Sequence, residues 1–309
     1  MVRPYVPIFK NTPVAAPSEP GHNLAAIKTY RYLRLGMLVA VAELAFSVVQ
    51  EYRQPKVHCF LGSISGYYYT PVHSVFISAM VAIGVALIVI KGRTAVEDAF
   101  LSLAGMMAPV VAFLPTSDDP QGVCRSQMRA VGRYQPPSSW RFTDASINNN
   151  LYALVFAGAI AVVLVLVAFL IPRLRRTAST TEYKTGTWIN LAGGAVLVVT
   201  GWILLGWAYS WVLRGHAKAA CAMFAFLAGA AVTNSWFGFK HKNTRERYAW
   251  TYGVVGASMI VAGVLFVVVH VFARSNLNRH LVLYIEATEI LLFVIYWSVQ
   301  TVERWKKTV

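Results

Sequence analysis

The segment His280-Leu-Val-Leu-Tyr-Ile-Glu286-Ala-Thr-Glu289 decides the fold. It places two carboxylates about one helical turn apart, in a stretch that stays apolar as far as Trp297. A charge at membrane depth costs roughly 2.5–3.5 kcal/mol or more, so it usually faces the interior of a helix bundle and often marks a functional position. We therefore interpret the rest of the chain as a membrane bundle that contains this segment.

The composition of the whole chain supports several membrane spans. Of its 309 residues, 57% are hydrophobic and 13% are charged, whereas about 25% are charged in a typical soluble domain. A span needs about 20 consecutive apolar residues. Eight segments come close to that length, at about 33–52, 72–91, 95–114, 150–171, 188–213, 218–238, 249–273 and 280–302.

We therefore predict an all-α polytopic membrane protein, a bundle of about eight transmembrane helices with an extracytoplasmic loop cap. Residues 1–32 are expected to form a cytoplasmic tail and an interfacial helix, and residues 33–309 the transmembrane bundle. The basic stretch from Leu24 to Arg34 either lies in the membrane interface or is the charged start of the first span.

The positive charges indicate how the spans are oriented. With the N-terminus inside, 18 of the 28 lysines and arginines fall on the inner side of the eight segments and 10 on the outer side. Because cytoplasmic loops carry an excess of these residues, both termini are expected to be cytoplasmic. We attribute the net charge of +15 to lysines and arginines at the span ends that contact lipid headgroups. Membrane lipids are therefore the expected partners. Nucleic-acid binding is not expected, since no basic stripe with interleaved aromatic residues lies outside the spans.

Two long loops lie on the predicted outer side, at 51–71 and 115–149. Cys59 is in the first loop and Cys124 in the second, so both face an oxidising compartment and are expected to form a disulfide bond. Cys221 lies inside a span and is expected to be a small packing residue.

Three carboxylates are the main candidates for a ligand- or proton-binding site. At about 1.5 Å per residue, Glu43 lies about 14–15 Å from either end of its span, and Glu286 and Glu289 lie at depths of about 9 and 14 Å. Together they predict a proton-handling or cation-binding cluster. The alternative is that each is a buried structural carboxyl, bonded to hydroxyl or amide groups of neighbouring helices.

Other polar side chains gather on the same predicted side. Tyr68 and His270 complete the candidate ligand- or proton-binding set. His73, His270, His280 and Glu286 are weak candidates for a zinc site, because no paired His motif supports them. No cofactor is otherwise expected.

A resemblance rests on Ser63-Ile-Ser-Gly-Tyr-Tyr-Tyr-Thr70, on Leu103-Ala-Gly105 and Leu114-Pro-Thr116, and on the ending from Glu286 to Trp297. These stretches resemble an uncharacterised group of bacterial multi-pass inner-membrane proteins that has a Ser-Ile-Ser-x-Tyr-Tyr-Tyr-Thr stretch before the second span. The resemblance implies a bacterial inner-membrane location and brings no known activity. The paired-His metal pattern of alkaline ceramidases and adiponectin-type receptors is not matched, so their zinc site is not carried over.

The first functional hypothesis is a non-enzymatic protein that binds or translocates a lipid or small amphiphile through an outward-facing polar cavity lined by the three glutamates. The second is a metal-dependent intramembrane lipid hydrolase. The third is an accessory or sensory subunit of a larger membrane complex, with protein partners. The sequence does not choose between them, although it favours a non-catalytic role.

Overall fold

In the computed structural model, the described residues are 20–55, 57–114, 116, 123–134, 143–171, 181–207, 215–240, 246–272 and 280–305. They form nine α-helices and one 3-10 helix, with no strand among them. The elements are α1 (Pro20–Tyr52), η1 (Ser65–Tyr69), α2 (His73–Val89), α3 (Ala95–Phe113), α4 (Val123–Ala130), α5 (Thr143–Leu170), α7 (Thr181–Trp207), α9 (His216–Lys240), α10 (Glu246–Phe272) and α11 (Leu281–Trp305).

Every one of the eight apolar segments lies in a helix of its own, but only six of these helices are long and apolar enough to cross a membrane. The six are α1, α3, α5, α9, α10 and α11. The apolar helix α2 and the apolar part of α7, Thr187–Ile203, are shorter than the other six. This architecture is that of a helical, multi-pass membrane protein, and within the described residues the long apolar helices number six, not the eight that were expected.

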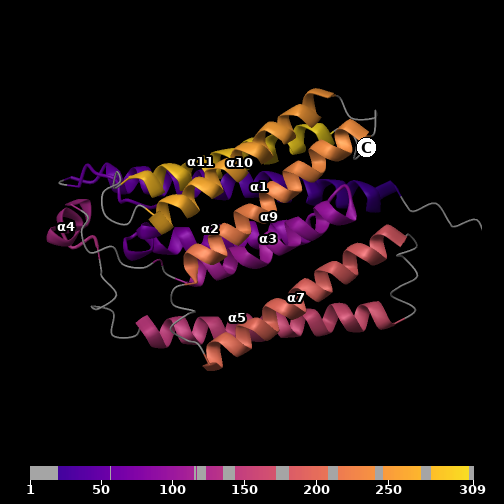
Figure 1. The fold of residues 1–309 in the computed structure, drawn as a ribbon, viewed down its shortest axis with the longest axis horizontal. Helices are drawn as coiled ribbons and strands as arrows, with labels where there is room; N and C mark the ends of the chain where they lie inside the picture. Colours follow the sequence, from indigo (N-terminus) through magenta and orange to yellow (C-terminus); the bar gives the residue numbers. More distant parts are fainter. Residues whose placement is uncertain are drawn as a thin grey trace, which may run out of the picture.

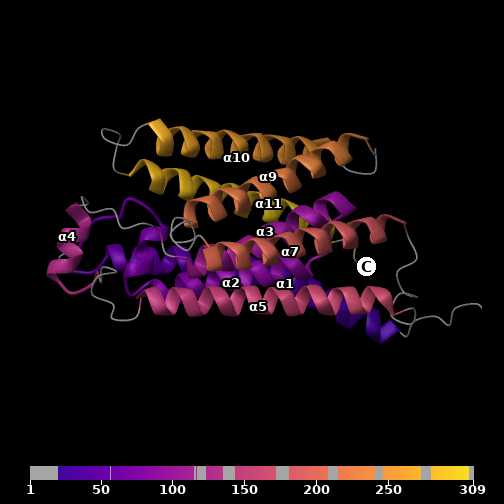
Figure 2. The same cartoon turned by 60° about the horizontal axis from the view of Figure 1, so that its bottom comes forward.

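The helices run side by side along the long axis of the molecule (Figure 1). Helix α3 lies in the middle, packed against α2, α7 and α9, while α10 packs on α9 and α11. Helices α5 and α7 form a pair at one side of the bundle (Figure 1). Both contact α3, and α7 lies next to it in Figure 2. The pair exposes apolar side chains such as Phe156, Leu164 and Val196, each more than 60% exposed, as expected of a surface that faces lipid tails.

Glycine permits a close backbone contact between α2 and α3. A Cβ atom added to Gly84 would lie 2.8 Å from the carbonyl oxygen of Gly105, and one added to Gly105 would lie 2.6 Å from the carbonyl oxygen of Gly84. No larger side chain fits between these two backbones, so the pair fixes how α2 and α3 approach each other.

The two ends of the bundle differ. One end, which we call the capped end, carries η1, α4 and the loop that follows α1 (Figure 1). The other, which we call the charged end, holds the beginning of α1 and the end of α11, where Arg31 donates a 2.7 Å hydrogen bond to the carbonyl oxygen of Trp305. Helix α1 is continuous from Pro20 to Tyr52, so the expected interfacial stretch and the first apolar segment form one helix.

Candidate functional site

The predicted disulfide between Cys59 and Cys124 is confirmed, with Cα atoms 5.6 Å apart. It ties the loop after α1 to α4. A second link lies close by, where the Arg133 guanidinium donates 2.7 and 2.6 Å hydrogen bonds to the two oxygens of Glu51. These charge-assisted bonds raise the pKa of Arg133 above its ordinary value. The capped end is therefore held by one covalent and one ionic link.

Glu286 lies at the capped end and binds the start of η1. Its carboxylate accepts hydrogen bonds from the hydroxyls of Ser63 (2.9 Å) and Ser65 (3.1 Å) and from the backbone N–H of Ile64 (2.6 Å). The N–H groups that open a helix lack backbone acceptors, and a negative charge beside them is favourable. These donors hold the carboxylate in place, so we infer that Glu286 positions η1 against α11.

The tyrosines of η1 are buried, and none of them points into open solvent. Burial raises the pKa of Tyr67 to about 12 and raises that of Tyr68, so both phenols are neutral at physiological pH. The ring of Tyr68 packs against His73 at a centroid distance of 4.3 Å. His73 also donates from Nδ1 to the carbonyl oxygen of Tyr68 at 2.7 Å, because a carbonyl can only accept.

Glu289 lies one turn further along α11 in very different surroundings. Only 3% of the residue is exposed, yet neither carboxylate oxygen has a hydrogen-bond partner among the residues that the structure describes. The backbone of Gly263 in α10 is close enough that an added Cβ would lie 3.8 Å from Oε1. A buried carboxyl without any donor is unusual, so Glu289 is the candidate for a group that binds a proton or a ligand.

A groove lies between α10 and α11, along the first turns of α11 that precede Glu289. Its volume is about 450 Å³ and its lining is mostly apolar. Ala257, Ser258, Val261, Ala262 and Leu265 line it from α10, and Leu281, Tyr284, Ile285 and Thr288 line it from α11. Glu289 follows Thr288 in the chain and lies one turn from Ile285, but it is not itself among the lining residues, and its carboxyl faces Gly263 inside the bundle.

The structure does not gather the three predicted glutamates into one site. Glu286 binds η1, Glu289 is buried near Gly263, and Glu43 is exposed on the outer surface of α1. Glu43 has no hydrogen bond or ion pair with any residue that the structure describes.

The candidate zinc ligands are also not assembled in the described part of the chain, where no three His, Cys, Asp or Glu side chains lie close enough to share a metal ion. His73 contacts Tyr68, and His280 lies 6.4 Å from the ring of Tyr284. His270 belongs to α10, but its side chain lies outside the described residues.

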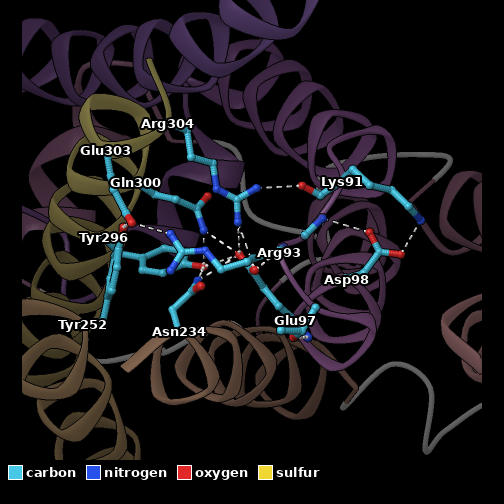
Figure 3. A network of polar contacts seen from close by, with 12 residues as sticks. Lys91, Arg93, Glu97, Asp98, Asn234, Tyr252, Tyr296, Gln300, Glu303 and Arg304 are labelled. Atoms are coloured by element: carbon cyan, nitrogen blue, oxygen red, sulfur yellow. Dashed lines mark hydrogen bonds and ion pairs between the residues drawn. The ribbon is translucent and has the colours of Figure 1, made fainter. Parts of the chain in front are cut away.

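The charged end contains a buried polar network that the sequence did not predict. Its centre is Glu97, which is fully buried in the first turn of α3. Arg304 donates to both carboxylate oxygens at 3.2 and 3.0 Å, and Asn234 and Gln300 donate to Oε1 at 2.8 and 2.5 Å. The backbone N–H of Arg93 donates to Oε2. One carboxylate thus connects α3, α9 and α11 (Figure 3).

Two further carboxylates complete this network. Glu303 accepts from Arg93 at 2.5 Å and from the hydroxyl of Tyr252 in α10 at 2.7 Å. Asp98 accepts from Lys91 at 2.7 Å. The three carboxylates Asp98, Glu303 and Glu97 form ion pairs with Lys91, Arg93 and Arg304, respectively. Because partnered charges can be buried and unpartnered ones cannot, these six residues specify how the helix ends meet.

Helix α1 joins the network through aromatic contacts. Arg34, only 1% exposed, lies over the rings of Tyr30 and Trp297 at 4.7 and 4.6 Å. Trp297 in turn donates from its indole nitrogen to the carbonyl oxygen of Arg34 at 3.1 Å. The Nη2 of Arg34 also donates a 2.6 Å hydrogen bond to the hydroxyl of Tyr30, and the cation–π contacts compensate Nε and Nη1, which have no acceptor among the described residues.

A sequence signal for the charged end does exist. Acidic Glu97 and Asp98 follow basic Lys91 and Arg93, and a second pair, Glu303 and Arg304, ends the last span. Glu97 and Asp98 lie in the first turn of α3, where acidic side chains favour a helix N-terminus. They do meet that terminus, since Asp98 accepts from the N–H of Gly92 at 3.0 Å, but they also bind distant helices.

Comparison with known protein families, curated proteins and solved structures found no match to this chain.

Proposed function

We propose that this chain is a bacterial inner-membrane protein that crosses the membrane eight times, with both termini in the cytoplasm, and binds a lipid or small amphiphile from the outer half of the bilayer. The groove between α10 and α11 is the proposed binding site. The single observation that carries the proposal is Glu289, a buried carboxyl with no hydrogen-bond partner among the described residues, in the helix turn that follows an apolar groove.

The groove and the carboxyl together suggest the chemistry of the ligand. A volume of about 450 Å³ is within the range of small-molecule sites, and its apolar lining suits an acyl or alkyl chain. The two oxygens of Glu289 lack donors, so they favour a headgroup that supplies them. A long-chain amine or a hydroxyl-bearing lipid meets both conditions, whereas an anionic headgroup does not.

The two ends of the bundle support access from the capped end. The groove is lined by the first turns of α11, whereas the charged network involves its last turns. The polar side chains of the charged end bind one another and close that end. We infer an outward-facing site that a ligand reaches from the bilayer, without a path through the bundle.

The test uses two probes of equal chain length, a long-chain amine and a long-chain carboxylic acid. Binding to the purified protein in lipid nanodiscs is measured with radiolabelled probes. We expect the amine to bind and Glu289→Gln to weaken its binding about tenfold or more, since a hydrogen bond to a charged group contributes about 1.5–3 kcal/mol. Ala257→Phe, at an exposed groove position, is expected to block binding sterically.

Glu286→Gln is the matched control, because the two residues are three positions apart on the same helix and Glu286 already has its donors. It should leave amine binding close to that of the natural protein. Equal binding of both probes, or amine binding that neither Glu289→Gln nor Ala257→Phe lowers, contradicts the proposed site.

A further inference from the structure

The end of α9 and the start of α10 meet at the charged end of the bundle (Figure 1), and both expose aromatic side chains there. Trp236 and Phe239 of α9 are 73% and 49% exposed, and Trp250 of α10 is 64% exposed. The rings of Phe239 and Trp250 meet edge to face at a centroid distance of 5.3 Å. The three side chains therefore form one surface across two helices, which we call the α9–α10 aromatic patch.

Close packing of α9 and α10 fixes the geometry of this patch. A Cβ atom added to Gly256 of α10 would lie 2.9 Å from a methyl carbon of Val232 and 3.2 Å from its backbone nitrogen. A larger side chain at this position would push the two helices apart, so glycine sets how closely they approach. The aromatic side chains of the patch are therefore presented by two helices that are held together.

Two basic side chains border the patch on the side of the helix ends. Lys240 follows Trp236 by four residues, and Arg247 precedes Trp250 by three, which places the bases about 6 and 4.5 Å closer to the end of the bundle. Both bases are exposed. Arg247 lies over the ring of Tyr248 at 5.0 Å and donates to its hydroxyl at 3.2 Å. Neither base forms an ion pair with a residue that the structure describes.

Lys240 and Arg247 differ in this respect from the bases inside the charged network. Each base of that network pairs with a carboxylate, and these bases are Lys91, Arg93 and Arg304. Glu246 is an acidic neighbour of Arg247, but the stretch 240–247 contains four basic residues and one acidic residue, which is a net charge of +3. A surface with this excess of positive charge attracts an anionic partner.

The order of side chains along the two helices indicates what kind of anion this is. From the helix ends inward, the exposed residues change from basic to aromatic and then to aliphatic, with Val232 and Val254 43% and 62% exposed. A phospholipid has the same order, with a charged phosphate, a polar ester region and apolar chains. Tryptophan side chains favour the ester region, and basic side chains extend to the headgroups. A soluble anion or an acidic protein segment matches only the basic part.

We propose that the α9–α10 aromatic patch, with Lys240 and Arg247, binds an anionic phospholipid. The phosphate contacts the two bases, and the acyl chains lie over Val232 and Val254. Basic sites between transmembrane helices on the cytoplasmic side bind anionic headgroups in this way. The inference rests on the proposed function only for its orientation, which places this lipid in the inner leaflet. The site itself is separate from Glu289, which lies toward the capped end.

The test compares phosphatidylglycerol with phosphatidylcholine of the same acyl chains. Each lipid is titrated into the protein in detergent, and native mass spectrometry gives the dissociation constant of the bound lipid. We expect phosphatidylglycerol to bind at least about tenfold more tightly. A base near an anionic headgroup contributes about fivefold, so Lys240→Gln combined with Arg247→Gln should raise the dissociation constant of phosphatidylglycerol about 30-fold. Trp236→Ala combined with Trp250→Ala should weaken the binding of both lipids.

Arg53→Gln combined with Lys218→Gln is the matched control, because it removes the same charge from exposed residues at the capped end. This control should leave the binding of phosphatidylglycerol unchanged. Both charge variants should keep the SDS unfolding midpoint of the natural protein and its binding of the long-chain amine. A protein that binds phosphatidylglycerol as expected but not the amine contradicts the proposed function alone, and the reverse result contradicts this inference alone.

Two results with the lipids overturn the proposal. One is equal binding of phosphatidylglycerol and phosphatidylcholine by the natural protein, and the other is equal loss of phosphatidylglycerol binding in the two charge variants. Glycerol phosphate and hexaglutamate serve as soluble probes. If either binds as tightly as phosphatidylglycerol and loses its binding with Lys240 and Arg247, a soluble anion or an acidic protein segment replaces the lipid as the partner.

Discussion

Substitution of two buried glutamates by glutamine tests whether the charged network stabilises the bundle. Glu97 and Glu289 are 0% and 3% exposed, and the substitution changes neither shape nor volume by much. They differ in their partners. Glu97 accepts hydrogen bonds from Arg304, Asn234, Gln300 and the backbone of Arg93, whereas both oxygens of Glu289 have none.

The expected magnitudes follow from these contacts. In Glu97→Gln, one carboxylate oxygen becomes an NH₂ group, and donors face both oxygens. Either orientation of the amide therefore sets donor against donor and also leaves Arg304 without its buried counter-charge. Removal of one partner of a buried ion pair costs about 3–5 kcal/mol. Glu289→Gln loses no hydrogen bond, so its effect on the free energy of unfolding should stay within about 1 kcal/mol.

The free energy of unfolding is measured by titration with SDS in mixed micelles. Tryptophan fluorescence provides one signal. Reaction of the half-buried free thiol of Cys221 in α9 with a thiol-specific dye provides another, because the thiol becomes accessible when α9 separates from its neighbours. Agreement of the two signals shows that the bundle unfolds as a unit.

The result that refutes the reasoning is equal stability of the two variants. If Glu97→Gln unfolds within about 1 kcal/mol of Glu289→Gln, the buried charges of the network are not what holds the helix ends together. If Glu289→Gln were destabilised and Glu97→Gln were not, the carboxyl of Glu289 would have a structural partner.

Three further predictions concern the capped end and the helix contacts. Replacement of Cys59 and Cys124 by alanine should lower the free energy of unfolding by about 4 kcal/mol, the loop-closure value for a separation of 65 residues, measured by SDS titration. Glu286→Gln should speed amide hydrogen exchange in η1 about tenfold, because a charged acceptor of several donors is lost. Gly84→Ala should destabilise the protein by about 1–3 kcal/mol, whereas Gly36→Ala, which has open space, should not change its unfolding.

The sequence by itself determined the local structure. Apolar length predicted eight helical segments, and each one is a helix, because the backbone groups of an apolar segment in lipid must be satisfied within that segment. The disulfide was also predicted correctly, since the span order placed both cysteines on the same side. These conclusions depend on position along the chain, which a sequence states directly.

The tertiary structure decided the partners of each buried charge. The sequence gives the depth of Glu43, Glu286 and Glu289, and on that basis they were expected to form one cluster. The structure separates them, because depth does not specify the rotation of a helix about its own axis. Rotation is set by side-chain packing between helices, such as the contact of Gly84 with Gly105. For the same reason, the position of Glu97 near the start of its apolar segment does not reveal that packing buries it among side chains of α9 and α11.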